Sequence, residues 1–128
     1  MLASSKLVGF VATAHPEAAR RFYVDKLGLK LIDDSPYALV VQASTTTIRI
    51  QKVEQVASLE YTALGWEVSN IDETVRRLAA EGISCELFEG MKQSPEGVWR
   101  TPNGSAVAWF RDPDRNLLSI TQHVHSEA

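Results

Sequence analysis

The sequence predicts an α+β fold made of two βαβββ modules, and the main observation is an internal repeat. Residues 10–28 read FVATAHPEAARRFYVDKLG, and residues 66–82 read WEVSNIDETVRRLAAEG. Each copy contains an apolar strand, a turn, an amphipathic helix with an Arg-Arg pair, and a closing glycine. A similar length of strand-like sequence follows each copy. Two curved mixed sheets, each covered by its helix on one face only, can pack to enclose a cavity, so the repeat also predicts where a binding site would lie.

The first module is expected over residues 5–54. His15-Pro16 opens its helix, because proline suits the first helical position, and Gly28 closes it. Clustered or alternating β-forming residues predict its four strands at Lys6–Thr13, Leu29–Asp33, Tyr37–Ala43 and Thr46–Val53.

The second module is expected over residues 60–124, and both modules belong to one domain spanning residues 1–128. Asn70 suits the helix N-cap, with Glu73 three residues later, and Gly82 ends the helix. The polar segment Glu89–Gly97 predicts a loop. Its strands are predicted at Tyr61–Ser69, Ile83–Phe88, Ser105–Arg111 and Leu117–His123, with a brief extension at Val98–Arg100.

Composition favours a single cytoplasmic globular domain. The chain has 128 residues and a formal net charge of −3, and its close cationic pairs lie within the two predicted helices, so nucleic acid is not an expected partner. No apolar run approaches the roughly 20 residues of a membrane span. The N-terminal residues lack the pattern of a signal peptide, and the single Cys85 excludes an intramolecular disulfide.

Three features together resemble the vicinal oxygen chelate superfamily: FYVDKLGLKL after a short helix, the βαβββ repeat, and WFRDPDRNLLSI near the C-terminus. This superfamily includes glyoxalase I, extradiol dioxygenases, and fosfomycin- and bleomycin-resistance proteins. The resemblance covers nearly the whole chain and implies the fold, but no single reaction, because one fold hosts many functions. It also implies a homodimer. DPDRN predicts a tight turn, in which Arg115 occupies a position where the family usually has glycine.

The resemblance also implies a divalent metal held by His, Glu or Gln side chains from the first and fourth strands of each module. The corresponding positions are Val8, Arg49 (or Gln51 after a slip of two), Ala63 (or Leu64 after a slip of one) and Ser119. The best-aligned four are poor ligands for a divalent ion, and the permanent charge of arginine repels a cation. We therefore expect no metal and no cofactor.

Other residues offer little compensation for these positions. His15 is expected at a helix start, away from the sheet interior. The sequence shows no recognisable Ser-His-Asp or Cys-His arrangement. Cys85, beside Glu86, is expected to be a buried, inert thiol. An adventitious metal at His123 and His125 remains an alternative.

Strand alternation predicts which side chains face the cavity. The opposite parity, which includes Trp66, Phe110 and Ile120, is apolar and should pack on the helices. The inward set combines aromatic, small and polar residues, as small-molecule sites do. Its candidate ligand-binding members are Phe10, Arg49, Gln51, Glu67, Trp109 and Ser119.

Two of these residues have alternative interpretations. Arg49 either clamps a ligand carboxylate or phosphate, or pairs with Glu67 or another carboxylate and holds the modules together. Trp109 either stacks on a planar or cationic ligand or only fills space. The Glu89–Gly97 loop, with Trp99, is either a lid or a plain surface connection.

The leading functional hypothesis is a metal-independent binding protein for a small molecule, such as an antibiotic or another anionic or aromatic ligand. A second hypothesis is an enzyme of the same superfamily. It would be a lyase, isomerase or dioxygenase with displaced metal ligands, or an enzyme that uses Glu67 as a metal-free base. A third is a structural, dimerising module without a ligand.

Overall fold

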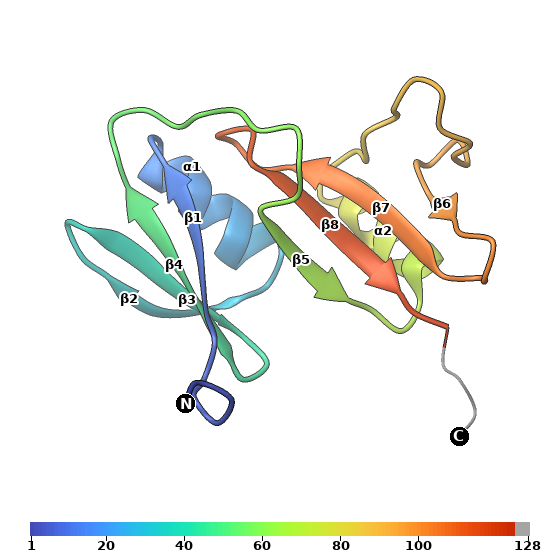
Figure 1. Ribbon diagram of the computed structural model, residues 1–128. Coiled ribbons are helices and arrows are strands. Elements are labelled where there is room, and N and C mark those ends of the chain that lie inside the picture. The colour runs from blue at the N-terminus through green and yellow to red at the C-terminus, as the bar shows by residue number, and fades with distance from the viewer. Residues whose placement is uncertain (125–128) are drawn as a thin grey trace. The chain divides into compact units, whose positions relative to one another are not determined.

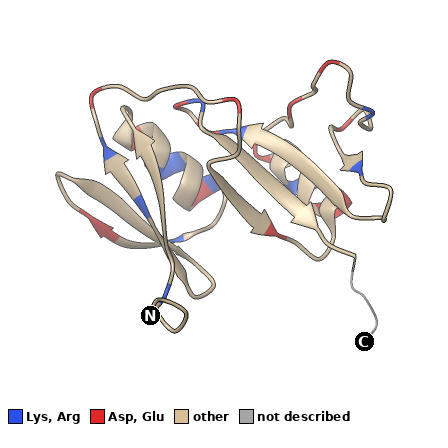
Figure 2. Ribbon diagram, viewed as in Figure 1, with Lys and Arg blue, Asp and Glu red and all other residues tan. Residues whose placement is uncertain are grey.

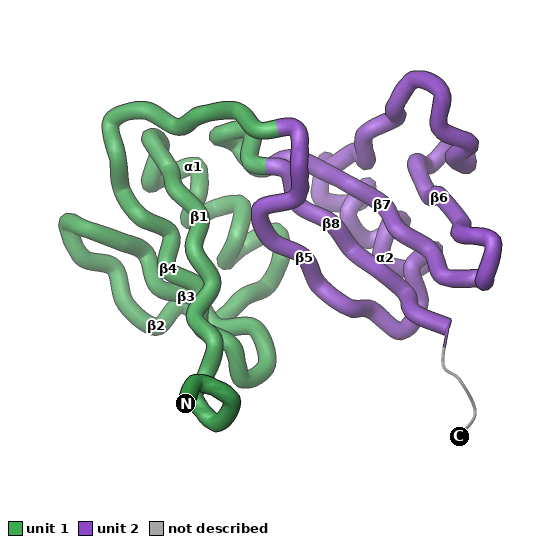
Figure 3. The backbone as a smooth tube through the Cα atoms, in the orientation of Figure 1, with its two compact units in different colours: residues 1–59, 112–116 green, residues 60–111, 117–128 purple. Residues whose placement is uncertain are grey.

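The computed structural model describes residues 1–124, so His125 lies outside the described residues. The chain divides into two compact units, coloured separately in Figure 3. The first contains residues 1–59 and Asp112–Asn116, and the second contains residues 60–111 and continues from Leu117. In the described part of the chain, no helix is long and apolar enough to cross a membrane.

The first unit is a four-stranded sheet covered by one helical segment (Figure 1). The strand order is β1-β4-β3-β2, with β1 parallel to β4 and the other pairs antiparallel. The predicted helix begins as α-helix and continues as π-helix, η1, after Arg20. The elements are β1 Val8–Thr13, α1 Pro16–Arg20, η1 Arg21–Lys26, β2 Lys30–Asp34, β3 Ala38–Ala43 and β4 Thr46–Lys52.

The second unit repeats this topology, which confirms the predicted βαβββ repeat. Its strand order is β5-β8-β7-β6, again with one parallel pair, β5 with β8. The Asn70 side chain accepts a hydrogen bond from the Glu73 amide at 3.1 Å, as expected for an N-cap. The elements are β5 Leu64–Glu67, α2 Ile71–Ala80, β6 Trp99–Arg100, β7 Ala106–Arg111 and β8 Leu117–Gln122.

The strand predicted at Ile83–Phe88 is wrong, because the second strand of this module is instead the short β6. The segment makes one backbone bond to β7, from the Glu86 amide to the Trp109 carbonyl at 2.7 Å. The Gln93 side chain accepts a hydrogen bond from the backbone amide of Phe88 and donates one to the backbone carbonyl of Glu86. A longer strand ladder would need these same two backbone groups. The β-forming composition of the segment is thus overridden by tertiary contacts.

One face of each sheet packs on its helix and forms the core, as the strand alternation predicts. In β1 and β4 the buried members are Val11, Thr13, Ile48 and Ile50, and the helical segment contributes the buried Ala19, Phe22 and Tyr23. In the second unit, Ala106, Ala108 and Phe110 of β7 alternate with less buried residues. We call the other face of each sheet its open face. The central strand β8 departs from alternation, because Leu117 to Ile120 are all buried.

Hydrogen bonds that are buried or partly buried fix the Asp112–Asn116 turn within the first unit. Tyr23 donates its hydroxyl proton to Asp112 at 2.6 Å, and the Asn116 side chain donates to the Ala12 carbonyl at 2.8 Å. Arg115 adopts a φ of 70°, the left-handed conformation that glycine takes at low cost. Arginine adopts this backbone conformation less readily than glycine, the residue that the superfamily usually has at this position.

Candidate functional site

An aromatic cluster occupies the open face of the second sheet, centred on Trp109. Phe88 meets Trp109 edge to face, with ring centroids 5.5 Å apart and an interplanar angle of 85°. Trp99 also contacts Trp109, with ring centroids 6.3 Å apart and an interplanar angle of 31°. Trp99 pairs with Val107 in the β6–β7 register, so it projects from the same face as Trp109 two residues along. We call Phe88, Trp99 and Trp109 the aromatic cluster.

The sheet beside Trp109 carries small side chains. Ser119 of β8 is opposite Trp109, and Gly65 of β5 is opposite Ser119. A Cβ atom at Gly65 would lie 2.7 Å from the Ser119 Oγ, so this position accommodates no larger residue without a shift. Ser119 is buried and Gly65 is exposed, so the sheet next to Trp109 presents backbone and a small side chain and no second large ring.

Charged groups border the aromatic cluster. The Arg111 Nε donates to the Glu86 carboxylate at 3.0 Å, and a second guanidinium nitrogen lies 3.8 Å from Glu60. Glu67, on the same sheet face as Ser119, is exposed and lies 3.9 Å from the imidazole of His123. Glu67 thus has a weak partner within its own unit.

The open face of the first sheet brings together Phe10, Arg49 and Gln51. Phe10 is opposite Arg49 in the β1–β4 register, and Val40 of β3 is opposite Arg49 on the other side. Phe10 is 52% exposed although it is a large apolar residue. Among the described residues of the first unit, Arg49 has no hydrogen-bond or ion-pair partner. An exposed guanidinium next to an aromatic ring can bind an anion.

The predicted site residues therefore form two groups: Phe10, Arg49 and Gln51 on one sheet, and Glu67, Trp109 and Ser119 on the other. The sequence predicts a regular strand at Glu86 and Phe88 and therefore gives them no part in the site. It predicts Trp99, with the Glu89–Gly97 loop, as part of either a lid or a plain surface connection. The signal that points to the two aromatic residues is the recurrence of aromatic side chains at 88, 99 and 109, of which 99 and 109 lie in the two strands of one hairpin.

The positions that correspond to the superfamily's metal ligands do not fit a divalent ion. Val8 and Ala63 supply no side-chain donor, and Arg49 supplies a positive charge. Ser119 offers a single neutral hydroxyl, which is a weak ligand. Within residues 1–124, no three or more His, Cys, Asp or Glu side chains gather as a metal site would require.

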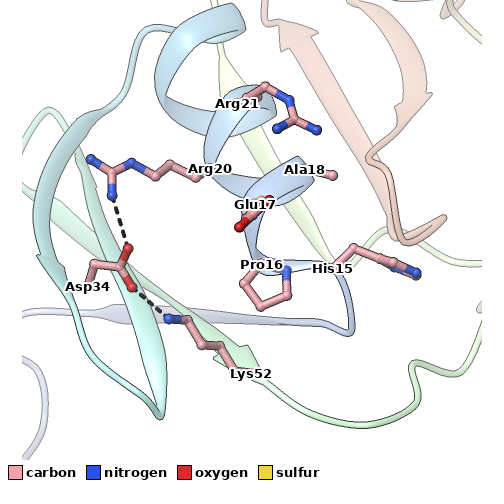
Figure 4. Close-up of a pocket in the computed structure, with 8 residues that line it drawn as sticks. All are labelled: His15, Pro16, Glu17, Ala18, Arg20, Arg21, Asp34 and Lys52. Atoms are coloured by element: carbon pink, nitrogen blue, oxygen red, sulfur yellow. Dashed lines mark hydrogen bonds and ion pairs between the residues drawn. The ribbon is translucent and has the colours of Figure 1, made fainter.

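A surface depression lies elsewhere on the first unit, around α1 (Figure 4). Arg20 and Lys52 both bind Asp34 there, at 3.0 and 2.6 Å. The hydrogen bond from Lys52, together with Arg20, lowers the pKa of the Asp34 carboxyl. None of the predicted site residues lines this depression, and its charges largely compensate one another. The lining residues are His15, Pro16, Glu17, Ala18, Arg20, Arg21, Asp34 and Lys52.

Cys85 has the character of an inert thiol. Burial, and then the neighbouring Glu86 carboxylate, raise its pKa to about 11. A thiol with this pKa is protonated near neutral pH and is therefore a poor nucleophile.

Lys and Arg positions alternate with Asp and Glu positions along both units, within the residues that the structure describes (Figure 2).

The family model for the Glyoxalase/Bleomycin resistance protein/Dioxygenase superfamily matches residues 7–120. The chain belongs to this superfamily, as the sequence resemblance indicated. A Bacillus subtilis (strain 168) relative, the uncharacterized protein YraH, is 32% identical over 114 residues, covering 77% of this chain and 83% of that protein.

Solved structures with the same fold include proteins with different activities. Lactoylglutathione lyase from Agrobacterium tumefaciens has a TM-score of 0.72 and 18% identity, and covers 93% of each chain. TnmS3, an antibiotic binding protein from Streptomyces sp. CB03234, has a TM-score of 0.66 and 22% identity, and covers 97% of this chain and 99% of its own. At these identities the likeness establishes the fold and leaves function to the site.

Proposed function

We propose that the protein binds a small, planar organic molecule without a metal, on the open face of its second sheet. The observation that carries this proposal is the aromatic cluster of Phe88, Trp99 and Trp109 beside the small residues Ser119 and Gly65. Aromatic rings with partly uncovered faces offer dispersion and quadrupole contacts to a flat ligand, worth about 0.5–1.5 kcal/mol per ring pair beyond area burial. Apolar contact would supply most of the affinity.

Two fold neighbours mark the alternatives. An antibiotic binding protein and a lactoylglutathione lyase share this fold, so both binding and catalysis are compatible with it. The side chains at Val8, Arg49, Ala63 and Ser119 favour binding, because they offer a divalent ion no set of strong donors. Sequestration of an aromatic antibiotic or a similar ligand by a cytoplasmic homodimer is the form of this function that we propose.

Fluorescence titration with 1-anilinonaphthalene-8-sulfonate, an aromatic anion with a flat naphthalene ring system, tests the proposal. Wild-type protein should bind the dye, and Trp109→Ala should raise its Kd by about tenfold, since the variant removes the central ring. Tyr37→Ala is a matched control, because Tyr37 is an aromatic residue that is 79% exposed in the first unit. Absence of dye binding by the folded wild type, or an unchanged Kd in Trp109→Ala, would contradict the proposal.

Arg49 is a separate candidate for anion recognition, on the open face of the first sheet. Its guanidinium has no partner among the described residues of its unit, so an anionic ligand would meet little competition from a neighbouring carboxylate. Benzoate, a simple carboxylate, tests this face separately from the dye. Arg49→Gln should weaken benzoate binding several-fold, with no change in the affinity for the uncharged benzamide. Equal effects on both compounds would assign Arg49 a structural role.

A further inference from the structure

We infer that Gln93 is the positioning residue of the aromatic cluster: its side-chain amide holds the 86–88 segment in the place from which Phe88 contacts Trp109. The inference rests on the proposed function for its effect on ligand affinity. It concerns a residue outside the predicted site, in the Glu89–Gly97 loop, for which the sequence predicts either a lid or a surface connection.

The hydrogen bonds of Gln93 carry the inference. Its Oε1 accepts from the Phe88 amide at 2.7 Å, and its Nε2 donates to the carbonyls of Glu86 and Gly97 at 2.9 and 2.8 Å. The amide thus uses both of its donor hydrogens and its acceptor on backbone groups. A single side chain replaces the ladder that Glu86 and Phe88 would need in a regular strand.

The held segment reaches the aromatic cluster through three contacts with β7. The Glu86 amide binds the Trp109 carbonyl at 2.7 Å, and the Glu86 carboxylate binds the Arg111 Nε at 3.0 Å. Phe88, two residues later, then meets the Trp109 ring edge to face at 5.5 Å. Gln93 therefore acts on Trp109 through the backbone of Glu86 and Phe88.

Gln93 also lies beside the third ring. Its backbone forms an isolated bridge with Trp99, which contacts Trp109 from β6. Gly97, whose carbonyl accepts from Gln93, is buried against Cys85, and a Cβ atom there would lie 2.8 Å from the Cys85 Cβ. Gly97 and the 85–88 segment are thus packed in close contact. The side-chain amide of Gln93 binds both, and the segment carries Phe88 of the aromatic cluster.

The test uses protein labelled with 5-fluorotryptophan, which carries one fluorine at each of three indoles. Trp66 is an internal control, because it stacks on Phe110 with centroids 6.3 Å apart, on the face that packs on the helix. Gln93→Ala should shift the ¹⁹F resonances of Trp109 and Trp99 and leave that of Trp66 in place. Gln55→Ala, an exposed glutamine of the first unit, should shift none of them.

The same variants are then titrated with 1-anilinonaphthalene-8-sulfonate. Gln93→Ala should raise the Kd about fivefold or more, and Gln55→Ala should leave it unchanged. Gln93→Glu keeps the acceptor but loses both donors when ionised, so its affinity should be weak at neutral pH. It should rise in part only as the carboxyl is protonated, below about pH 4, because a protonated carboxyl regains one donor.

Two results would overturn the inference. One is an unshifted Trp109 resonance with an unchanged Kd in Gln93→Ala. The other is a shift of Trp66 together with Trp109, which would indicate general loss of packing. If the wild type fails to bind the dye while Gln93→Ala still shifts Trp109 selectively, the proposed ligand function fails and the positioning role of Gln93 stands.

Discussion

The hydroxyl of Tyr23 is fully buried and donates to the carboxylate of Asp112, 89 residues later in the chain. Burial, and then the charge of Asp112, raise the pKa of Tyr23 far above its ordinary value, so the phenol remains a donor. Tyr23→Phe leaves this carboxylate short of one partner and should lower the free energy of unfolding by about 1.5–3 kcal/mol. Urea denaturation measures this, and Tyr61→Phe, at 66% exposure, should change little.

The Asp114 carboxylate stabilises the first unit, and this stabilisation is lost at acid pH. Burial by itself would raise its pKa, but hydrogen bonds from Thr13, the Ala14 amide and His15 outweigh burial and lower it. A lowered folded pKa means that the contribution is present above the unfolded value of about 4 and is lost as pH falls through the folded pKa.

The destabilisation caused by Asp114→Asn should therefore be large at pH 7 and shrink as the pH falls below about 4. Urea denaturation of the variant and the wild type across this range measures it. A destabilisation that stays constant with pH would contradict the assignment.

At the scale of elements, the N-cap of α2 allows a sharp test. The Asn70 side chain accepts from the Glu73 amide at 3.1 Å and satisfies a group that the helix leaves unpaired. Asn70→Ala should cost about 1 kcal/mol of unfolding free energy, and Asn70→Asp should retain stability, because aspartate is an equivalent cap. Thermal and urea unfolding of both variants would show this. Equal losses in both would argue against a capping role.

Elements with strong local signals were predictable from sequence. Val11 and Ile48 lie at alternate positions in strands, and Asn70 begins a helix whose apolar residues recur at helical spacing, so these patterns required no tertiary information. The segment Ile83–Phe88 carries a strand-like pattern too, but the backbone bond from the Glu86 amide to the Trp109 carbonyl does not extend into a ladder with β7. Sequence pattern does not reveal that Gln93 takes the backbone groups that a ladder would use.

At the scale of the whole molecule, the metal question is open to direct measurement. With Val8, Arg49, Ala63 and Ser119 at the positions of the superfamily's ligands, EDTA should leave dye affinity unchanged, and Zn²⁺, Ni²⁺, Mn²⁺ or Fe²⁺ should leave the thermal midpoint unchanged. Metal content of the purified protein provides an independent check. A stoichiometric metal would restore the enzyme hypothesis and require ligands at other positions.

Neighbouring residues are enough to predict the superfamily, the duplicated βαβββ order and the strand parity that puts Phe10, Arg49, Trp109 and Ser119 on open faces. These properties depend on periodicity and local chemistry. The contacts of Phe88 and Trp99 with Trp109, and the hydrogen bonds of Gln93 to the 86–88 segment, become visible only in the folded chain. Segments that are distant in the sequence compete for the same backbone groups and ring surfaces. No local sequence pattern specifies which of these segments makes the contact.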